Sequence, residues 1–223
     1  MKIITKKEIL PVALITIAFI VGIFLYPILP EKIPSHWNIR GEVDSWSGKN
    51  FAVFFIPSLT LGIYFLMTFI PLIDPLRKNY LKFAVPYFCF RITLVLFFVL
   101  LYFYSLWAAF KTEPNINYFI LPIFSVLFIV IGIFLPKVKK NYFIGIRTPW
   151  TIHSEEVWNK THQFGGKFFI VGGLIALSGL LFPKHLSLIF IIAILFSALI
   201  PVAYSYFIFS KIGGFNKETK GRE

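Results

Sequence analysis

Six long runs of mostly apolar residues alternate with short polar segments along the chain, and they cover residues 9–29, 51–73, 83–110, 118–135, 166–182 and 186–209. About 20 such residues are enough for one helix to cross a bilayer, whose hydrocarbon core is about 30 Å thick. The segments between the runs are too short to form an independent soluble domain. The pattern therefore predicts an all-α membrane protein with six transmembrane helices.

We expect one membrane domain, residues 1–223, with two parts: a first helix pair at 9–73 whose connecting loop spans 30–50, and a four-helix part at 83–223 that carries a long polar segment at 141–166. The first run follows several lysines, as the core of a signal peptide does. It is longer than the about 7 to 15 residues of such a core, and it ends in Tyr26-Pro27-Ile28-Leu29-Pro30 where a signal peptide has small residues. We therefore expect it to be retained as a helix.

Composition and charge agree with a membrane protein and predict its orientation. The chain is 57% hydrophobic and 14% charged, and its formal net charge is +12. Most of the 22 lysines and arginines fall at the amino terminus, in residues 74–82 and 136–167, and after residue 210. Because basic residues accumulate on the cytoplasmic side, this predicts a multi-pass protein of the cell (plasma) membrane with both termini in the cytoplasm and the 30–50 loop outside. Membrane lipids are then natural partners, whereas the dispersal of the charge over four segments argues against direct binding of nucleic acid.

The extracellular loop, residues 30–50, combines prolines, tryptophans and charged residues. Pro30 and Pro34 favour an extended backbone, and residues 38–41 favour a turn in which Gly41 takes a positive φ. We expect either a structured loop whose tryptophans anchor at the membrane surface or a recognition surface for something arriving from outside. A metal site built from Glu31, His36 and Asp44 would lack any familiar ligand spacing.

The cytoplasmic segment, residues 141–166, reads as the start of a helix. Ser154 is placed to act as its N-cap, with two glutamates in the first turn, where the helix dipole favours negative charge. Trp158 and His162 then fall four residues apart on one face. The pattern predicts a short amphipathic helix on the cytoplasmic leaflet, which the pair Gly165-Gly166 ends before the fifth crossing begins.

Arg91 is the one charged residue inside an apolar run. Two placements are open: at the inner interface, with residues 81–90 lying along the surface, or buried in the bundle with a functional role. A second observation favours transport: residues 19–25 resemble residues 128–135, and each stretch precedes one of the two polar segments. This would make the fold two inverted three-helix repeats, as in transporters of small molecules or ions.

The sequence contains no phosphate-binding loop, HExxH helix, paired cysteines or nucleophile elbow, and Cys89 is its only cysteine. The predicted topology also places two of the four histidines on each side of the membrane. We therefore expect no enzymatic activity, no cofactor and no metal.

Two stretches resemble a known family. Residues 33–46, Ile-Pro-Ser-His-Trp-Asn-Ile-Arg-Gly-Glu-Val-Asp-Ser-Trp, resemble the short domain of unknown function that precedes many SdpI-like proteins. Residues 145–166, Gly-Ile-Arg-Thr-Pro-Trp-Thr-Ile-His-Ser-Glu-Glu-Val-Trp-Asn-Lys-Thr-His-Gln-Phe-Gly-Gly, resemble the signature of the SdpI family itself.

The resemblance implies a bacterial-type membrane protein of the immunity class. Such a protein protects its cell against a secreted toxic peptide, and it can relay the presence of that peptide to a cytoplasmic repressor. By motif position, the partner-binding residues that the resemblance implies are His36, Trp37, Asn38, Gly41, Asp44 and Trp46 outside, and Arg147, Thr148, Trp150, Ser154, Trp158, His162, Gly165 and Gly166 inside.

Overall fold

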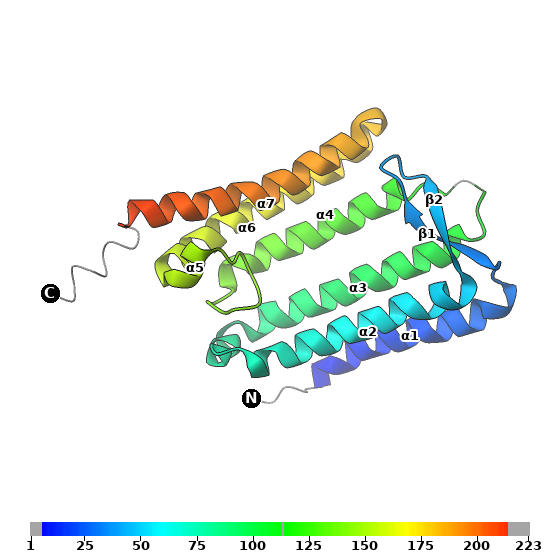
Figure 1. The fold of residues 1–223 in the computed structure, drawn as a ribbon, viewed down its shortest axis with the longest axis horizontal. Helices are drawn as coiled ribbons and strands as arrows, with labels where there is room; N and C mark the ends of the chain where they lie inside the picture. The colour runs from blue at the N-terminus through cyan, green and yellow to red at the C-terminus, as the bar shows by residue number, and fades with distance from the viewer. Residues whose placement is uncertain (1–5, 113, 214–223) are drawn as a thin grey trace.

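The computed structural model describes residues 6–112 and 114–213, and six long helices dominate this part of the chain (Figure 1). The long helices are α1 (Ile9–Leu25), α2 (Lys49–Ile73), α3 (Ala84–Ala108), α4 (Asn117–Phe134), α6 (Glu155–Ser178) and α7 (Leu186–Lys211). Two strands, β1 (Lys32–Trp37) and β2 (Val43–Gly48), lie between α1 and α2, and a short helix, α5 (Pro149–His153), precedes α6. Single 3-10 turns flank several helices, at Lys6–Glu8, Tyr26–Ile28, Arg77–Phe83, Leu135–Lys137, Gly179–Leu181 and Pro183–His185.

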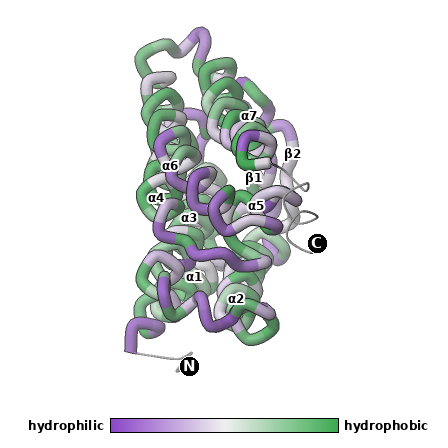
Figure 2. The backbone as a smooth tube through the Cα atoms, turned by 90° about the vertical axis from the view of Figure 1, so that its left-hand side faces the viewer, coloured by the Kyte–Doolittle hydropathy of each residue, from purple (hydrophilic) through white to green (hydrophobic). Residues whose placement is uncertain are grey.

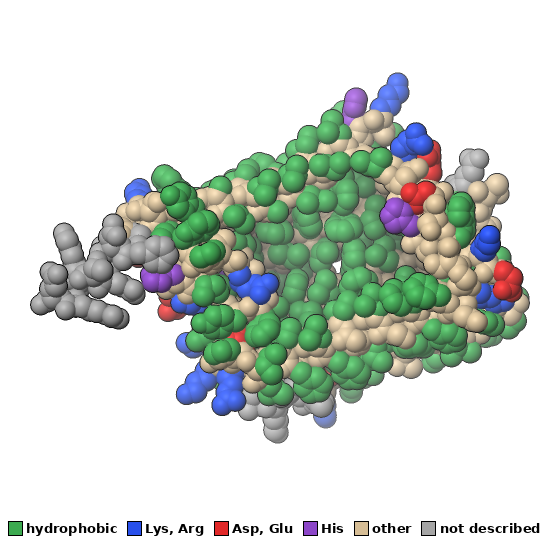
Figure 3. All heavy atoms as spheres, viewed as in Figure 1, with side chains coloured by type: hydrophobic (Ala, Val, Ile, Leu, Met, Phe, Trp, Pro, Cys, Tyr) green, Lys and Arg blue, Asp and Glu red, His purple; other side chains and the backbone are tan. Residues whose placement is uncertain are grey.

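All six predicted crossings are confirmed as helices that are long and apolar enough to span a membrane. Many of their large apolar side chains face outward: Phe24 is 80% exposed and Leu181 77% exposed. Figure 3 shows apolar side chains along the sides of the bundle and charged ones mainly at its two ends. Figure 2, seen from the side of α5, shows hydrophilic residues in the segments nearest the viewer and mostly hydrophobic residues along the helices behind them. This is the distribution that lipid around the sides and water at the ends would require.

The helices pack in two groups that meet between α3 and α4. In the first group α1, α2 and α3 contact one another, and in the second α6 lies between α4 and α7. The start of α1, the end of α7 and α5 lie at one end of the bundle, called here the α5 end, while the strands lie at the opposite, hairpin end (Figure 1).

The loop at residues 30–50 is not irregular but forms an antiparallel β-hairpin, which the sequence pattern did not predict. Lys32 pairs with Gly48, and Trp37 pairs with Val43. The predicted extended backbone at Pro34 is confirmed, as is the positive φ of Gly41, which is 83°. Buried and exposed side chains do not alternate cleanly in this segment, because the register between the strands is interrupted twice.

The predicted break at Gly165-Gly166 is wrong. Helix α6 begins after Ser154 and continues through both glycines to Ser178, so the expected surface helix is the first part of the fifth crossing. The glycines serve close packing: a Cβ added to Gly166 would lie 2.7 Å from the carbonyl oxygen of Gly132, and one on Gly165 would lie 2.6 Å from Ile146. Small residues that let backbones approach closely are typical of helix contacts in membranes.

Candidate functional site

The hairpin is fixed on the helices by its first strand. Ile33 is completely buried in the core between α1, α2 and α3, and the carbonyl of Pro34 accepts a 2.7 Å hydrogen bond from the Ser105 hydroxyl. The Trp37 ring packs on the Tyr104 ring with 5.7 Å between centroids. Of the two tryptophans predicted here, Trp37 therefore belongs to the scaffold, whereas Trp46 is 54% exposed.

The turn of the hairpin, residues 38–42, is held by its own side chains. The side-chain oxygen Oδ1 of Asn38 accepts hydrogen bonds from the backbone amides of Arg40, at 2.8 Å, and Glu42, at 3.1 Å. The Glu42 carboxylate accepts from the Asn38 amide at 2.9 Å and from Arg40 Nε at 3.0 Å. These hydrogen bonds stabilise the charged carboxylate, the one from the Asn38 side chain most strongly, and so hold the pKa of Glu42 below its ordinary value of 4.5.

Contacts from distant segments also fix this turn. The carbonyl of Gly41 accepts a hydrogen bond from the Ile116 amide at 3.0 Å, and the Asn115 side chain donates to the carbonyl of Arg40 at 3.1 Å. On the other side, the Ser187 hydroxyl donates to the carbonyl of Ile39. The turn thus touches the α3–α4 connection and the start of α7, so it bridges the two helix groups at the hairpin end.

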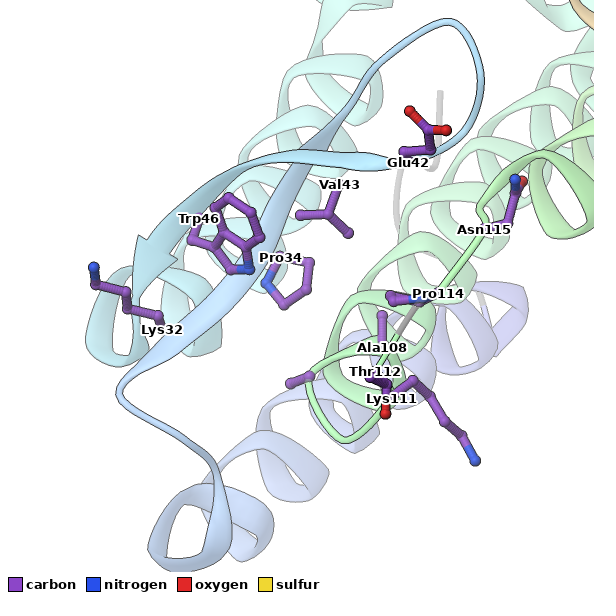
Figure 4. A pocket seen from close by; sticks show the side chains of 11 residues that line it. Lys32, Pro34, Glu42, Val43, Trp46, Ala108, Lys111, Thr112, Pro114 and Asn115 are labelled. Carbon is purple, nitrogen blue, oxygen red and sulfur yellow. The ribbon is translucent and has the colours of Figure 1, made fainter.

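A cavity of about 550 Å³ lies between the hairpin and the α3–α4 connection (Figure 4). Trp46, Pro34 and Val43 face it from the strands, and Lys111 and Thr112 lie across it. Its lining is completed by Lys32, Glu42, Ala108, Ala109, Pro114 and Asn115. Because the walls combine an exposed indole with lysines and a carboxylate, the cavity suits a ligand that has both apolar and charged groups.

His36 and Asp44 form an exposed pair on neighbouring strands. His36 Nδ1 lies 2.5 Å from an Asp44 carboxylate oxygen, and the side chains are 69% and 41% exposed. Within residues 6–112 and 114–213, no group of three His, Cys, Asp or Glu residues is placed to hold a metal ion, and Glu31 does not join this pair. The two predicted residues are therefore brought together as a polar contact surface.

At the α5 end, Asp74, Tyr80 and Asn141 organise the segment before α5, and the sequence reasoning missed all three. The Asp74 carboxylate accepts from the Leu76 and Tyr142 amides and from the Tyr80 hydroxyl, at 2.7, 3.0 and 3.0 Å. The Asn141 side chain, completely buried, accepts from the Phe143 and Ile144 amides and donates to the carbonyls of Lys139 and Ile144. No local sequence signal marked this network, because Asp74 and Tyr142 are 68 positions apart.

Trp158 and His162 share one face of the helix as predicted, but both are completely buried beneath this segment, in α6 and not in a separate helix on the cytoplasmic leaflet. Their rings stack 4.1 Å apart, and the Trp158 indole donates to the carbonyl of Val138 at 2.9 Å. His162 Nε2 accepts from the Ile146 amide at 3.1 Å, and its Nδ1 lies 2.8 Å from the carbonyl of Trp158, so the ring is a neutral tautomer with its proton on Nδ1. Gly145, with a φ of 111°, leaves room for this ring, since a Cβ there would collide with Nε2.

The remaining predicted residues at this end have different surroundings. Thr148 caps α5 and its hydroxyl lies 3.1 Å from that of Ser205, which ties α5 to α7. Ser154 caps α6 as predicted, accepting from the Val157 amide. Trp150 packs on Tyr206, and Arg147 is exposed and donates to the carbonyl of Tyr142 at 2.8 Å. Of these residues Thr148 is buried, Trp150 and Ser154 are half-buried, and Arg147 is exposed.

Arg91 is buried, which decides between the two placements that the sequence left open. Its guanidinium is 6% exposed and pairs with the Glu8 carboxylate, which is 12% exposed. It also donates to the Thr68 hydroxyl at 3.2 Å, and Tyr64 donates to the same Glu8 oxygen at 2.7 Å. Residues 84–90 are part of α3 and do not lie along the surface. Arg91 in α3 thus joins the start of α1 through Glu8 and α2 through Thr68.

The two sets of predicted residues lie at opposite ends of the bundle and match two family models. Residues 13–61 match the Domain of unknown function (DUF1648), and residues 137–205 match the SdpI/YfhL protein family. All the candidates of the hairpin end fall in the first match and all those of the α5 end in the second.

A similar protein is "Immunity protein SdpI" of Bacillus subtilis (strain 168), which is 29% identical over 94% of this chain and 99% of its own length. No solved structure matches the chain. Together with the six helices, these matches show a multi-pass cell membrane protein in which a match to DUF1648 precedes a match to the SdpI/YfhL protein family.

Proposed function

We propose that this protein gives its cell immunity to a secreted toxic peptide, and that the peptide is met at the hairpin end of the bundle, outside the cell. The similarity to an immunity protein along nearly the whole of both chains supports the activity. The excess of lysine and arginine toward the α5 end supports the orientation.

The observation that carries the proposal is the cavity of about 550 Å³ under the hairpin. Its walls offer an exposed indole in Trp46 and include Lys32 and Glu42, whereas the ammonium group of Lys111 points away and lies 5.1 Å from the centre of the Trp107 ring. Aromatic anchors beside charged groups are the usual sources of binding energy in peptide recognition. The hairpin is already ordered by Ser105, Asn115 and Ser187, so little conformational entropy is lost when a ligand binds.

Growth assays test this function directly. The gene is deleted from its host, and the minimal inhibitory concentration of peptides secreted by the same and neighbouring strains is measured with and without a plasmid copy. We expect deletion to sensitise the cells to at least one such peptide and the plasmid to restore resistance. Unchanged sensitivity to every secreted peptide would refute the proposal.

The matched variants are Trp46→Ala and Phe110→Ala. Both side chains are aromatic, lie at the hairpin end and are about half exposed, at 54% and 51%, but only Trp46 lines the cavity. We expect Trp46→Ala to lose protection at normal protein levels and Phe110→Ala to keep it. Equal protection by the two variants would place the peptide elsewhere.

We further propose that the α5 end relays the presence of the peptide to a cytoplasmic repressor. Support comes from the exposed Arg147 and the half-buried Trp150, which are presented by a segment that the Asp74 and Asn141 network holds rigid. The test is the distribution of a neighbouring helix-turn-helix repressor between membrane and cytoplasm, with and without peptide. A repressor that stays soluble both with and without peptide would refute the relay. A repressor whose distribution is the same with Arg147→Ala as with the native chain would refute it as well.

Transport of a small molecule or ion through an inverted repeat is the alternative function. Arg91, which motivated it, is paired with Glu8 and packed near the rings of Tyr64, Tyr87 and Phe88. No specific observation on the described residues therefore favours transport over immunity.

A further inference from the structure

A second cavity, separate from the hairpin, lies where the two helix groups meet near the α5 end. It has a volume of about 190 Å³, and α3, α4, α6 and the segment before α5 contribute to its walls. The walls are almost entirely apolar and include Phe90, Phe134, Ile146 and Phe169. Since a wholly apolar cavity offers too few hydrogen bonds to hold ordered water, its natural occupant is hydrocarbon.

Three lysines are next to lining residues along the chain and are called here the rim lysines: Lys82, Lys137 and Lys139. Lys137 holds its ammonium group 5.3 Å from the centre of the ring of Phe134, which lines the cavity. Along the chain, the exposed Lys82 precedes the lining residue Phe83, and the half-buried Lys139 follows the lining residue Val138. No lining residue is acidic.

Two of the acidic groups at this end are already engaged. Asp74 is 2% exposed and accepts three hydrogen bonds, and Glu156 pairs with Lys160 at 2.7 Å. In the described part of the chain, none of the three rim lysines forms an ion pair with a carboxylate. Figure 3 shows lysine and arginine side chains gathered at the α5 end beside the apolar hollow between the helix groups. An anion at this level would therefore find cations that have no competing partner.

We propose that this cavity and its rim form a binding site for an anionic glycerophospholipid. One acyl chain enters the cavity between α3 and α4, and the phosphate of the headgroup lies on Lys82 and Lys137. The charge of the rim selects an anionic headgroup over a zwitterionic one, as basic pockets between transmembrane helices do. The apolar walls select a lipid over free phosphate, because each buried methylene group contributes about 0.8 kcal/mol. The bound chain would fill the junction between the two helix groups.

Native mass spectrometry of the purified full chain in detergent tests this site. Phosphatidylglycerol and phosphatidylcholine with the same acyl chains are titrated separately. We expect one phosphatidylglycerol to bind clearly more tightly than phosphatidylcholine, and millimolar glycerol phosphate not to displace it. Equal affinity for the two lipids, or displacement by glycerol phosphate, would overturn the proposal.

Three variants locate the site. Lys82→Ala/Lys137→Ala is expected to weaken the binding of phosphatidylglycerol roughly 25-fold, since each cation contributes about a factor of five to the affinity. The same variant is expected to leave the binding of phosphatidylcholine unchanged. Lys184→Ala/Lys211→Ala removes the same charge elsewhere and is expected to change neither. Val130→Phe fills part of the cavity with the rim intact and is expected to weaken the bound phosphatidylglycerol.

Each of these variants can also overturn the site. An equal loss in both lysine pairs would mean attraction by the overall charge alone. Unchanged binding in Val130→Phe would mean that no acyl chain enters the cavity. Circular dichroism of each variant confirms that it is folded before its lipid affinity is compared.

Discussion

Replacing either partner of the buried Glu8–Arg91 pair should destabilise the protein, and replacing both should not. In Arg91→Leu the Glu8 carboxylate keeps only the hydrogen bond from Tyr64, and in Glu8→Leu the guanidinium keeps only Thr68. An uncompensated charge in such surroundings costs about 3 to 5 kcal/mol. For a chain of this length that corresponds to a decrease in Tm of about 6 to 20 °C.

The measurement is thermal unfolding of the purified full chain in detergent, followed by circular dichroism. Glu8→Gln keeps an oxygen that can accept from Tyr64, so its decrease in Tm should be smaller than that of Glu8→Leu. The double variant Glu8→Leu/Arg91→Leu should lie near the native Tm, because two apolar groups replace the pair. Lys6→Gln, at an exposed position in the same turn, serves as the control. A double variant as unstable as the sum of the single ones would refute the reasoning.

Three further predictions concern the two ends of the bundle. Gly145→Ala should destabilise the chain by at least about 1 to 2 kcal/mol, because it combines a positive φ with a collision against the buried imidazole of His162. Gly62→Ala, with open space around it, should stabilise α2 by up to about 1 kcal/mol. Both effects are measured as changes in Tm. Trp46→Ala should leave the Tm nearly unchanged, within about 0.5 kcal/mol, although we expect it to lose protection, and a large loss of Tm would show that the indole is structural. The pKa of Glu42 is lower in the folded hairpin than in the unfolded chain, so its contribution to stability is fully present above the unfolded value and is lost as the pH falls through the folded value. The protection factors of the amides in residues 38–42, which correct for the intrinsic pH dependence of exchange, should therefore fall below about pH 4.5 in the native chain and show no such step in Glu42→Gln.

Local patterns in the sequence were sufficient for the six crossings and for several details within them. Hydropathy located the helices. The N-cap of Ser154 and the ion pair between Glu156 and Lys160 follow from residue spacing along one helix. The positive φ of Gly41 follows from turn chemistry. Each of these depends on residues that are neighbours in the chain.

Contacts between distant segments were beyond such patterns. Arg91 could not be placed because its partner Glu8 is 83 positions away, and the burial of Trp158 could not be predicted because its acceptor, Val138, lies outside the helix. Gly165-Gly166 fits the end of a helix as well as a close helix contact, and only the approach of Gly132 decides between them. The hairpin was missed because its stability comes from the helices beneath it.

The bond between the Ser187 hydroxyl and the carbonyl of Ile39 joins residues that are 148 positions apart, so it has a consequence for biogenesis. The hairpin emerges between the first two crossings, but this support arrives only with the residues that begin the last one. During synthesis this bond therefore forms only after five crossings have been inserted and the sixth has begun, and until then water can hydrate the exposed carbonyl of Ile39. A product truncated before α7 would reach the membrane without this bond, while Asn115 and Ile116 would still hold the turn to the α3–α4 connection.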